Sequence, residues 1–147
     1  AEESYNLYLK NESFFSNQPI KKMSKVTQLF LQNIDYDKIK LLRESNFLYM
    51  HYHLAKYNEL EINITDLCGP MVYPLFCRVE GLKDYLIRNK VYVATYWKEV
   101  LDYMNKDSFE AQLAKYLVPL PIDQRYDHHV LDQIIQMVEN YLSGVCL

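Results

Sequence analysis

Apolar residues recur every three or four positions between residues 35 and 57, which is the spacing of one face of an α-helix. The residues on this stripe are Ile39, Leu42, Asn46, Met50, Leu54 and Tyr57. Asp35 or Asp37 can accept backbone N–H bonds at its start. The pattern predicts a helix with one packed face and a solvated face that carries the charged residues.

Weaker helical patterns occur in four other segments, which span residues 24–33, 80–89, 107–117 and 127–144. Ser24, Asp107 and Asp127 supply the side-chain acceptor that a helix start requires, and Glu110 completes a capping box with Asp107. We expect Gly144 to end the last helix. Residues 1–20 fit no single period and are expected to be irregular or partly helical.

Three segments have the character of β-strands. Residues 69–79 are β-rich but contain two prolines, which favours an edge or bulged strand. Residues 91–97 alternate between apolar and polar side chains, and residues 118–122 are extended because each proline disfavours helix in its predecessor. We therefore predict an α+β fold with a small antiparallel or mixed sheet of about three strands and helices mainly on one face.

Length and composition limit the possible classes. A chain of 147 residues is expected to form a single domain, with residues 1–23 as a lead-in segment and 24–142 as its folded body. The net charge of −3 and the scattered Lys and Arg argue against nucleic-acid binding. No apolar run is long enough to cross a membrane, and three separate glycines cannot build a nucleotide loop. Because the sequence starts with Ala1, a fragment of a longer chain must be considered.

Cysteine and histidine give no metal or catalytic motif. The three cysteines lack CxxC spacing and are expected to be buried thiols in a reducing compartment, so we predict a cytoplasmic protein. His51 and His53 are two apart on a predicted helix, and His128 and His129 are adjacent, so neither pair shares one face. We predict no catalytic, cofactor-binding or metal-binding residue in this chain.

Two edges carry the residues best suited to recognition. Tyr96 and Trp97 end the predicted strand 91–97, and Arg125 and Tyr126 lie in a polar loop after residues 118–122. Arginine offers a planar fork for carboxylate or phosphate, and the aromatic residues offer stacking and hydroxyl groups. A binding site and an ordinary surface rim both fit these four residues.

The chain resembles the C-terminal small domain of the DegT/DnrJ/StrS family, pyridoxal-phosphate-dependent aminotransferases that act mainly on nucleotide-linked sugars. The matching segments follow one another over about residues 20–142. They are Ser24-Lys25-Val26-Thr27-Gln28 with Ile34-Asp35, Arg43-Glu44-Ser45-Asn46-Phe47 as an Arg-x-x-Asn helix, Gly69-Pro70-Met71-Val72-Tyr73-Pro74, Glu80-Gly81-Leu82 with Tyr85-Leu86, and Leu117 to Pro121 with the closing helix.

The resemblance implies the small domain of a fold-type-I enzyme, which closes the substrate side of the active site. In the family a large domain holds pyridoxal 5'-phosphate and its Schiff-base lysine, and no segment of this chain matches that lysine motif. The expected partner is therefore a large domain in the same enzyme or in a partner chain, and a homodimer is expected. Tyr96, Trp97, Arg125 and Tyr126 would contact substrate, although only Tyr96 matches the family pattern at the strand end.

The composition also allows a different class of function. Tyrosine accounts for 14 residues, against six phenylalanines and one tryptophan. Tyrosine is enriched at protein interfaces because it combines a large apolar body with a hydroxyl group. A non-catalytic interaction module with a tyrosine-rich interface is therefore the alternative to the aminotransferase domain.

Overall fold

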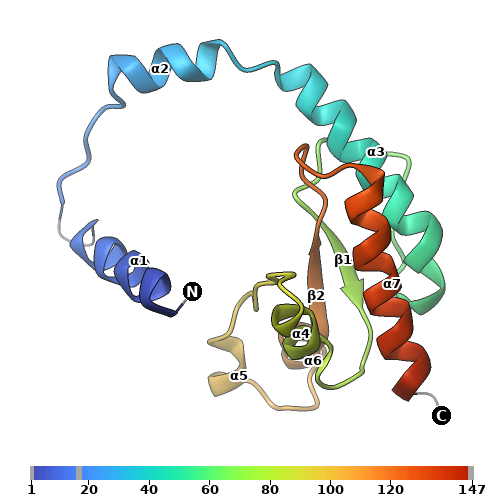
Figure 1. Ribbon diagram of the computed structural model, residues 1–147. Helices are drawn as coiled ribbons and strands as arrows, with labels where there is room; N and C mark the ends of the chain where they lie inside the picture. Colours follow the sequence, from blue (N-terminus) through green and yellow to red (C-terminus); the bar gives the residue numbers. More distant parts are fainter. Residues whose placement is uncertain (1, 16–17, 146–147) are drawn as a thin grey trace. The chain divides into compact units, whose positions relative to one another are not determined.

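The computed structural model describes residues 2–15 and 18–145 (Figure 1). The chain divides into two compact units, residues 1–34 and residues 35–147, which we call the N-terminal and C-terminal units. The boundary between the two units thus lies after residue 34, whereas the sequence predicts that the folded body begins at residue 24.

The N-terminal unit contains two helices, α1 (Glu2–Phe15) and α2 (Lys25–Gln32). As predicted, the Ser24 hydroxyl caps α2 by accepting a hydrogen bond from the Thr27 backbone N–H at 3.1 Å. No side chain that the structure describes in this unit is buried, and Phe30 on the apolar side of α2 is 72% exposed. The described residues of this unit therefore form no core of their own. Helices this short are marginal in water without a packing partner.

The C-terminal unit begins with helix α3 (Tyr36–Leu54), followed by a 3₁₀ turn, η1 (Ala55–Tyr57). The Asp35 carboxylate caps α3 through the Lys38 N–H at 2.9 Å, which confirms one of the two predicted caps. The buried residues of α3 are Asn46, Phe47, Met50 and Leu54. The side of α3 that faces away from the core also carries exposed apolar residues, Leu41, Leu48 and Tyr52.

The sheet of the C-terminal unit has two antiparallel strands, β1 (Val72–Phe76) and β2 (Leu117–Pro121) (Figure 1). Pro74 lies opposite Pro119, with Tyr73 opposite Leu120 on one side of that pair. Two prolines cannot exchange N–H bonds, so this pair occupies a position without ladder hydrogen bonds, and Tyr73 and Leu120 occupy a hydrogen-bonded one. The prolines therefore leave the ladder between the strands intact.

Both outer edges of the sheet are closed to further strands. Beside β1, the Asn58 side chain accepts from the Phe76 N–H at 3.0 Å and donates to the Pro74 carbonyl at 2.8 Å, and the Glu59 N–H donates to the Phe76 carbonyl. On β2, Pro119 and Pro121 stand where outward N–H groups would be. Such edges resist strand addition.

The predicted strand at residues 91–97 is wrong, and the sheet has two strands rather than about three. Residues 91–95 have no regular structure and residues 96–99 form a turn. Val93 is buried in the core but Thr95 and Trp97 are exposed, so the alternating face does not form. The proline edge of β2 and the covered edge of β1 explain why this alternating segment finds no ladder partner.

The remaining helices are α4 (Leu82–Arg88), α5 (Val100–Tyr103), α6 (Phe109–Tyr116) and α7 (His128–Val145). Ser108, rather than the predicted Asp107, caps α6 by accepting from the Ala111 N–H at 3.2 Å. The Asp127 carboxylate accepts from the Val130 N–H at 2.9 Å, as predicted for the start of α7. Gly144 does not end α7, which continues to the last described residue.

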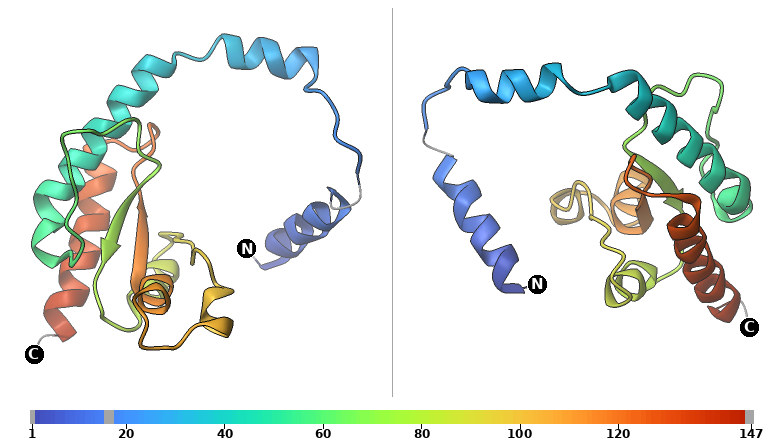
Figure 2. Two further views of the ribbon diagram at one scale, coloured as in Figure 1. Left: turned by 180° about the vertical axis from the view of Figure 1, so that it is seen from behind. Right: turned by 45° about the horizontal axis from the view of Figure 1, so that its top comes forward.

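Helices α3 and α7 contact each other and lie side by side next to the sheet (Figures 1 and 2). The core joins these helices to both strands and to α4; its fully buried members include Met50, Leu54, Tyr73, Leu75, Leu86, Leu120, Leu131 and Val138. The C-terminal unit is thus an α+β domain. None of the described helices is long and apolar enough to cross a membrane.

Candidate functional site

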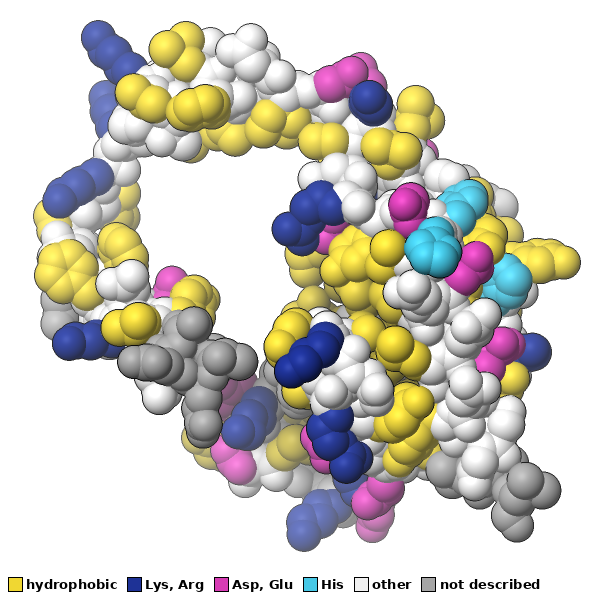
Figure 3. Space-filling view, in the orientation of Figure 1, with side chains coloured by type: hydrophobic (Ala, Val, Ile, Leu, Met, Phe, Trp, Pro, Cys, Tyr) yellow, Lys and Arg dark blue, Asp and Glu magenta, His cyan; other side chains and the backbone are white. Residues whose placement is uncertain are grey.

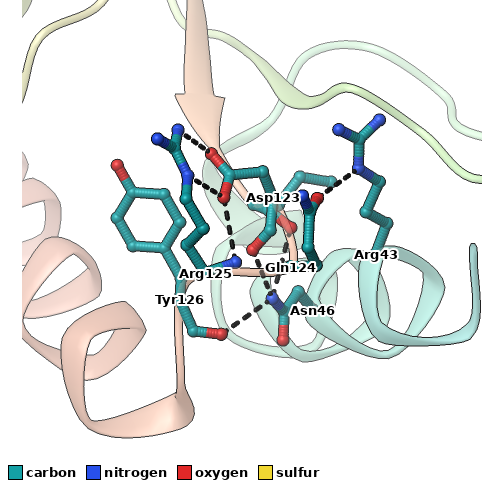
Figure 4. Close-up of polar contacts among 7 residues, drawn as sticks. Arg43, Asn46, Asp123, Gln124, Arg125 and Tyr126 are labelled. Atoms are coloured by element: carbon teal, nitrogen blue, oxygen red, sulfur yellow. Dashed lines mark hydrogen bonds and ion pairs between the residues drawn. The ribbon is translucent and has the colours of Figure 1, made fainter. Parts of the chain in front are cut away.

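The loop after β2 is anchored by Asn46, a side chain on α3 that is 4% exposed (Figure 4). Its amide nitrogen lies 3.2 Å from the Ile122 carbonyl, 3.1 Å from that of Asp123 and 3.1 Å from that of Tyr126. An amide nitrogen has two hydrogens, so at least one of them is shared between two carbonyls. One buried side chain thereby fixes the backbone of residues 122–126, which we call the Asn46 loop.

Arg43, one helical turn before Asn46, makes a second contact with the same loop (Figure 4). Its Nε donates to the Gln124 side-chain oxygen at 3.1 Å. Arg43 is half-buried, and this bond sets the plane of its guanidinium group. The Arg-x-x-Asn segment of α3 therefore holds the loop through its arginine and its asparagine.

Arg125 uses its guanidinium fork on a neighbour within the loop (Figure 4). Its Nε and Nη2 donate to the two oxygens of Asp123 at 2.8 and 2.7 Å, and its backbone N–H donates to the same carboxylate at 2.9 Å. The Arg125 guanidinium holds the pKa of Asp123 below its ordinary value, and Asp123 raises the pKa of Arg125. A ligand anion would therefore compete with Asp123 or meet the remaining Nη of Arg125.

Tyr126 closes the loop and begins the approach to α7. Its N–H donates to the Asp123 carbonyl at 3.1 Å, and its half-buried ring packs against the core. Asp127 then caps α7. The loop consequently has defined anchors at both ends: Asn46 on α3 and the first turn of α7.

Tyr96 and Trp97 lie in the turn before α5. Their ring centroids are 5.6 Å apart, and Trp97 is 58% exposed with a left-handed φ of 53°. Among the described residues, no hydrogen bond or ring contact joins Tyr96 or Trp97 to Arg125 or Tyr126. Tyr96 and Trp97 therefore lie together in one turn, and Arg125 and Tyr126 lie together in the Asn46 loop. The assignment of all four residues to one substrate site stays a prediction.

Several histidine side chains lie on the surface where α7 and α3 meet (Figure 3). The rings of His53 and His128 lie 4.9 and 4.1 Å from the Tyr49 ring, and the Tyr49 hydroxyl donates to Asp132 at 2.5 Å. This hydrogen bond raises the pKa of Tyr49. His51 points elsewhere, toward the rings of Phe47 and Tyr73. Within the described ranges, no three His, Cys, Asp or Glu side chains form a group that could hold a metal ion.

The cysteines match the prediction only in part. Cys77 is buried, and burial raises its pKa to about 11, so its thiol stays protonated and unreactive at neutral pH. Cys68 is exposed, so the prediction that it is buried is wrong; it lies just before Gly69 in a segment without regular structure. Cys146 lies outside the described residues.

The arrangement is suited to binding and positioning. The Asn46 loop is held by hydrogen bonds from α3 and carries the Arg125–Asp123 ion pair and the half-buried Tyr126 ring after β2. Reasoning from single residues placed Asn46 on the apolar stripe of its helix and did not assign it to the loop. A lone amide on an otherwise apolar face is the signal that could have identified it, because a buried amide needs partners.

Comparisons of the chain with models of protein families, with curated proteins and with solved structures gave no match.

Proposed function

We propose that the C-terminal unit is the small domain of a pyridoxal-phosphate-dependent aminotransferase related to the DegT/DnrJ/StrS family. It shapes and closes the substrate side of an active site whose cofactor is held by a large domain, in the same enzyme or in a partner chain. By itself the chain is not catalytic. The expected substrate is a nucleotide-linked sugar, the expected assembly a homodimer, and the expected compartment the cytoplasm.

One observation carries this proposal. The Arg-x-x-Asn segment at Arg43 and the segment around Leu117 to Pro121 resemble the family independently and are far apart in the sequence. In the fold they are joined, because Asn46 and Arg43 bind the loop that directly follows β2. A constellation whose parts meet in space supports a shared origin better than either motif alone. The α+β architecture agrees with such a domain.

The direct test is reconstitution with a large domain that holds the cofactor. The chain is combined with the large domain encoded upstream in the same reading frame or, failing that, on a separate chain from the same source. We expect sugar aminotransfer to require both parts, and Tyr96→Phe and Arg125→Ala to raise KM for the sugar nucleotide. Asp102→Asn, an exposed change in α5, is the matched control.

A cofactor-binding assay on the chain alone could contradict the proposed function. The chain is incubated with pyridoxal phosphate, reduced with borohydride and mapped by mass spectrometry. Scattered partial labelling of surface lysines is the expected result. Stoichiometric labelling of a single lysine, with a visible aldimine band, would contradict the proposal because it would show a complete cofactor site.

The exposed apolar side of α3 favours the second candidate, an interaction module. Leu41, Leu48 and Tyr52 are 66, 44 and 84% exposed, and their spacing places them along one side of the helix. Light scattering on wild type and on Tyr52→Glu would detect self-association through this side. A protein partner without any cofactor-bearing domain would favour the module over the aminotransferase domain.

A further inference from the structure

A cavity of about 290 Å³ lies between the end of α4, the segment that follows it and the first turns of α7. Its polar lining includes Lys90, Tyr92, Tyr126 and Gln133, and its apolar lining includes Ile134 and Met137. No aspartate or glutamate is among the lining residues. Half of the lining residues are polar and half are apolar, so the cavity combines apolar contact surface with polar groups that could fix the orientation of a small molecule.

Lys90 is the only charged residue of this lining. Within the described part of the chain, no carboxylate lies within ion-pair distance of its ammonium group, whereas Lys56, Lys115, Arg78 and Arg125 all have such partners. The cavity therefore carries one uncompensated positive charge at its edge, beside two phenol rings and an amide. An anionic group would be attracted there.

The backbone at Lys90 is unusual for a lysine. Its φ is 69°, in the left-handed region, and it terminates α4 in a Schellman motif: the Val91 N–H donates to the Leu86 carbonyl and the Lys90 N–H to that of Ile87. Glycine is the residue that this position favours, because a Cβ is strained there. A lysine at a strained position that lines a cavity is consistent with a requirement for its side chain.

We propose that this cavity binds a small organic anion, with an apolar portion the size of one ring packed over Ile134 and Met137 and a carboxylate or phosphate group facing Lys90. The tyrosines Tyr92 and Tyr126 supply stacking surface and hydroxyl groups, and Gln133 supplies an amide donor. The inference does not rest on the proposed function, because it concerns binding to this chain alone.

The test is an NMR titration of the full chain, labelled with ¹⁵N, with three probes. Benzoate carries ring and charge, benzyl alcohol carries the ring alone, and acetate carries the charge alone. We expect saturable shifts of the Lys90, Tyr92 and Gln133 amides with benzoate, and binding at least about threefold weaker for the other two, as a partly exposed charge pair allows. Equal binding of benzoate and benzyl alcohol, or no saturable shift at these amides, would overturn the proposal.

Variants separate the charge from the backbone effect. Lys90→Gly removes the cation and relieves the left-handed strain, so it should raise the melting temperature while abolishing the preference for benzoate over benzyl alcohol. Lys90→Arg should retain the preference, and Lys98→Ala, which removes a lysine outside the cavity, should leave it unchanged. Retention of the preference in Lys90→Gly, or its loss in Lys98→Ala, would show that Lys90 does not form the site.

Discussion

The Asn46 loop and the segment 91–97 are two irregular stretches of similar length, and they are held in different ways. The loop is bound to α3 through three hydrogen bonds from Asn46 and one from Arg43. The segment 91–97 follows Lys90 and ends at Trp97, and both of these residues have a left-handed backbone conformation. Between them, Val93 packs into the core. One stretch is positioned by polar side chains from a distant helix, the other by backbone conformation and by apolar side chains, of which Val93 is buried and Val91 partly buried.

This difference has an energetic consequence. Buried hydrogen-bond acceptors that lose their donor incur a full desolvation cost, so the Asn46 loop should depend steeply on a single residue. The apolar anchor of 91–97 contributes by burial, which is graded with the number of methyl groups. We therefore expect substitutions in the two stretches to differ in size and in chemical selectivity.

The largest effect is expected for Asn46→Asp, which preserves shape but places a carboxylate oxygen against three carbonyls. We expect a loss of about 3 kcal/mol or more in the free energy of unfolding, measured by urea denaturation at neutral pH. Asn46→Ala should cost about 2 kcal/mol, because it removes the Asn46 donor from the Ile122 and Tyr126 carbonyls, whereas the Asp123 carbonyl keeps the Tyr126 N–H. Ser45→Ala, at an exposed neighbour on α3, is the control and should change stability by under about 0.5 kcal/mol. If Asn46→Asp costs no more than the control, the anchoring role is wrong.

The next effect concerns the apolar anchor of the other stretch. Val93→Ala removes two methyl groups from a side chain that is 9% exposed and should cost about 2 kcal/mol. The exposed Thr95→Ala should cost little. Hydrogen exchange would show the change concentrated in residues 91–97; a uniform change over the whole core would mean that this segment is not an independently anchored stretch.

A smaller effect of opposite sign is expected at the start of the same stretch. Lys90→Gly should stabilise the chain by about 1 kcal/mol relative to Lys90→Ala, because both remove the charge but only glycine relieves the left-handed strain. Thermal denaturation of the two variants side by side measures the difference. Equal stability would indicate that φ at this position relaxes without cost.

The smallest effect is expected for Asp123→Asn, and it should depend on pH. Arg125 lowers the pKa of Asp123 in the folded chain, so the ionised carboxylate adds stability above its unfolded pKa, and this stability is lost as pH falls through the folded pKa. The variant should therefore be slightly less stable at pH 7 and indistinguishable from wild type in acid below that value. Because Arg125 is largely exposed, a melting-temperature change of at most about 3 °C is expected at pH 7. A difference that grows on acidification would contradict the pairing.

Local signals predicted much of the C-terminal unit. The buried positions Met50 and Leu54 follow from periodicity, and the cap at Asp35 follows from an acceptor side chain near in sequence. Both observed strands follow from β-rich composition or from prolines that disfavour helix. The errors arose where partners are distant: alternation at 91–97 indicated a strand, but on the edge of β1 the Phe76 N–H is already bound by Asn58, and on the edge of β2 prolines replace N–H groups. Likewise, the sequence pattern indicates only that Asn46 lies on the buried stripe of its helix. Its role as an anchor depends on loop residues some 80 positions later in the chain.

The opposed pair Pro74 and Pro119 also fixes how β1 and β2 are aligned during folding. Shifting one strand by a single residue requires turning it over, which would aim the ring nitrogen of Pro74, or those of Pro119 and Pro121, at the neighbouring strand where a hydrogen must be donated. The misaligned strand pair would lack those bonds and bury the wrong side chains. The three prolines therefore disfavour a shifted register between β1 and β2.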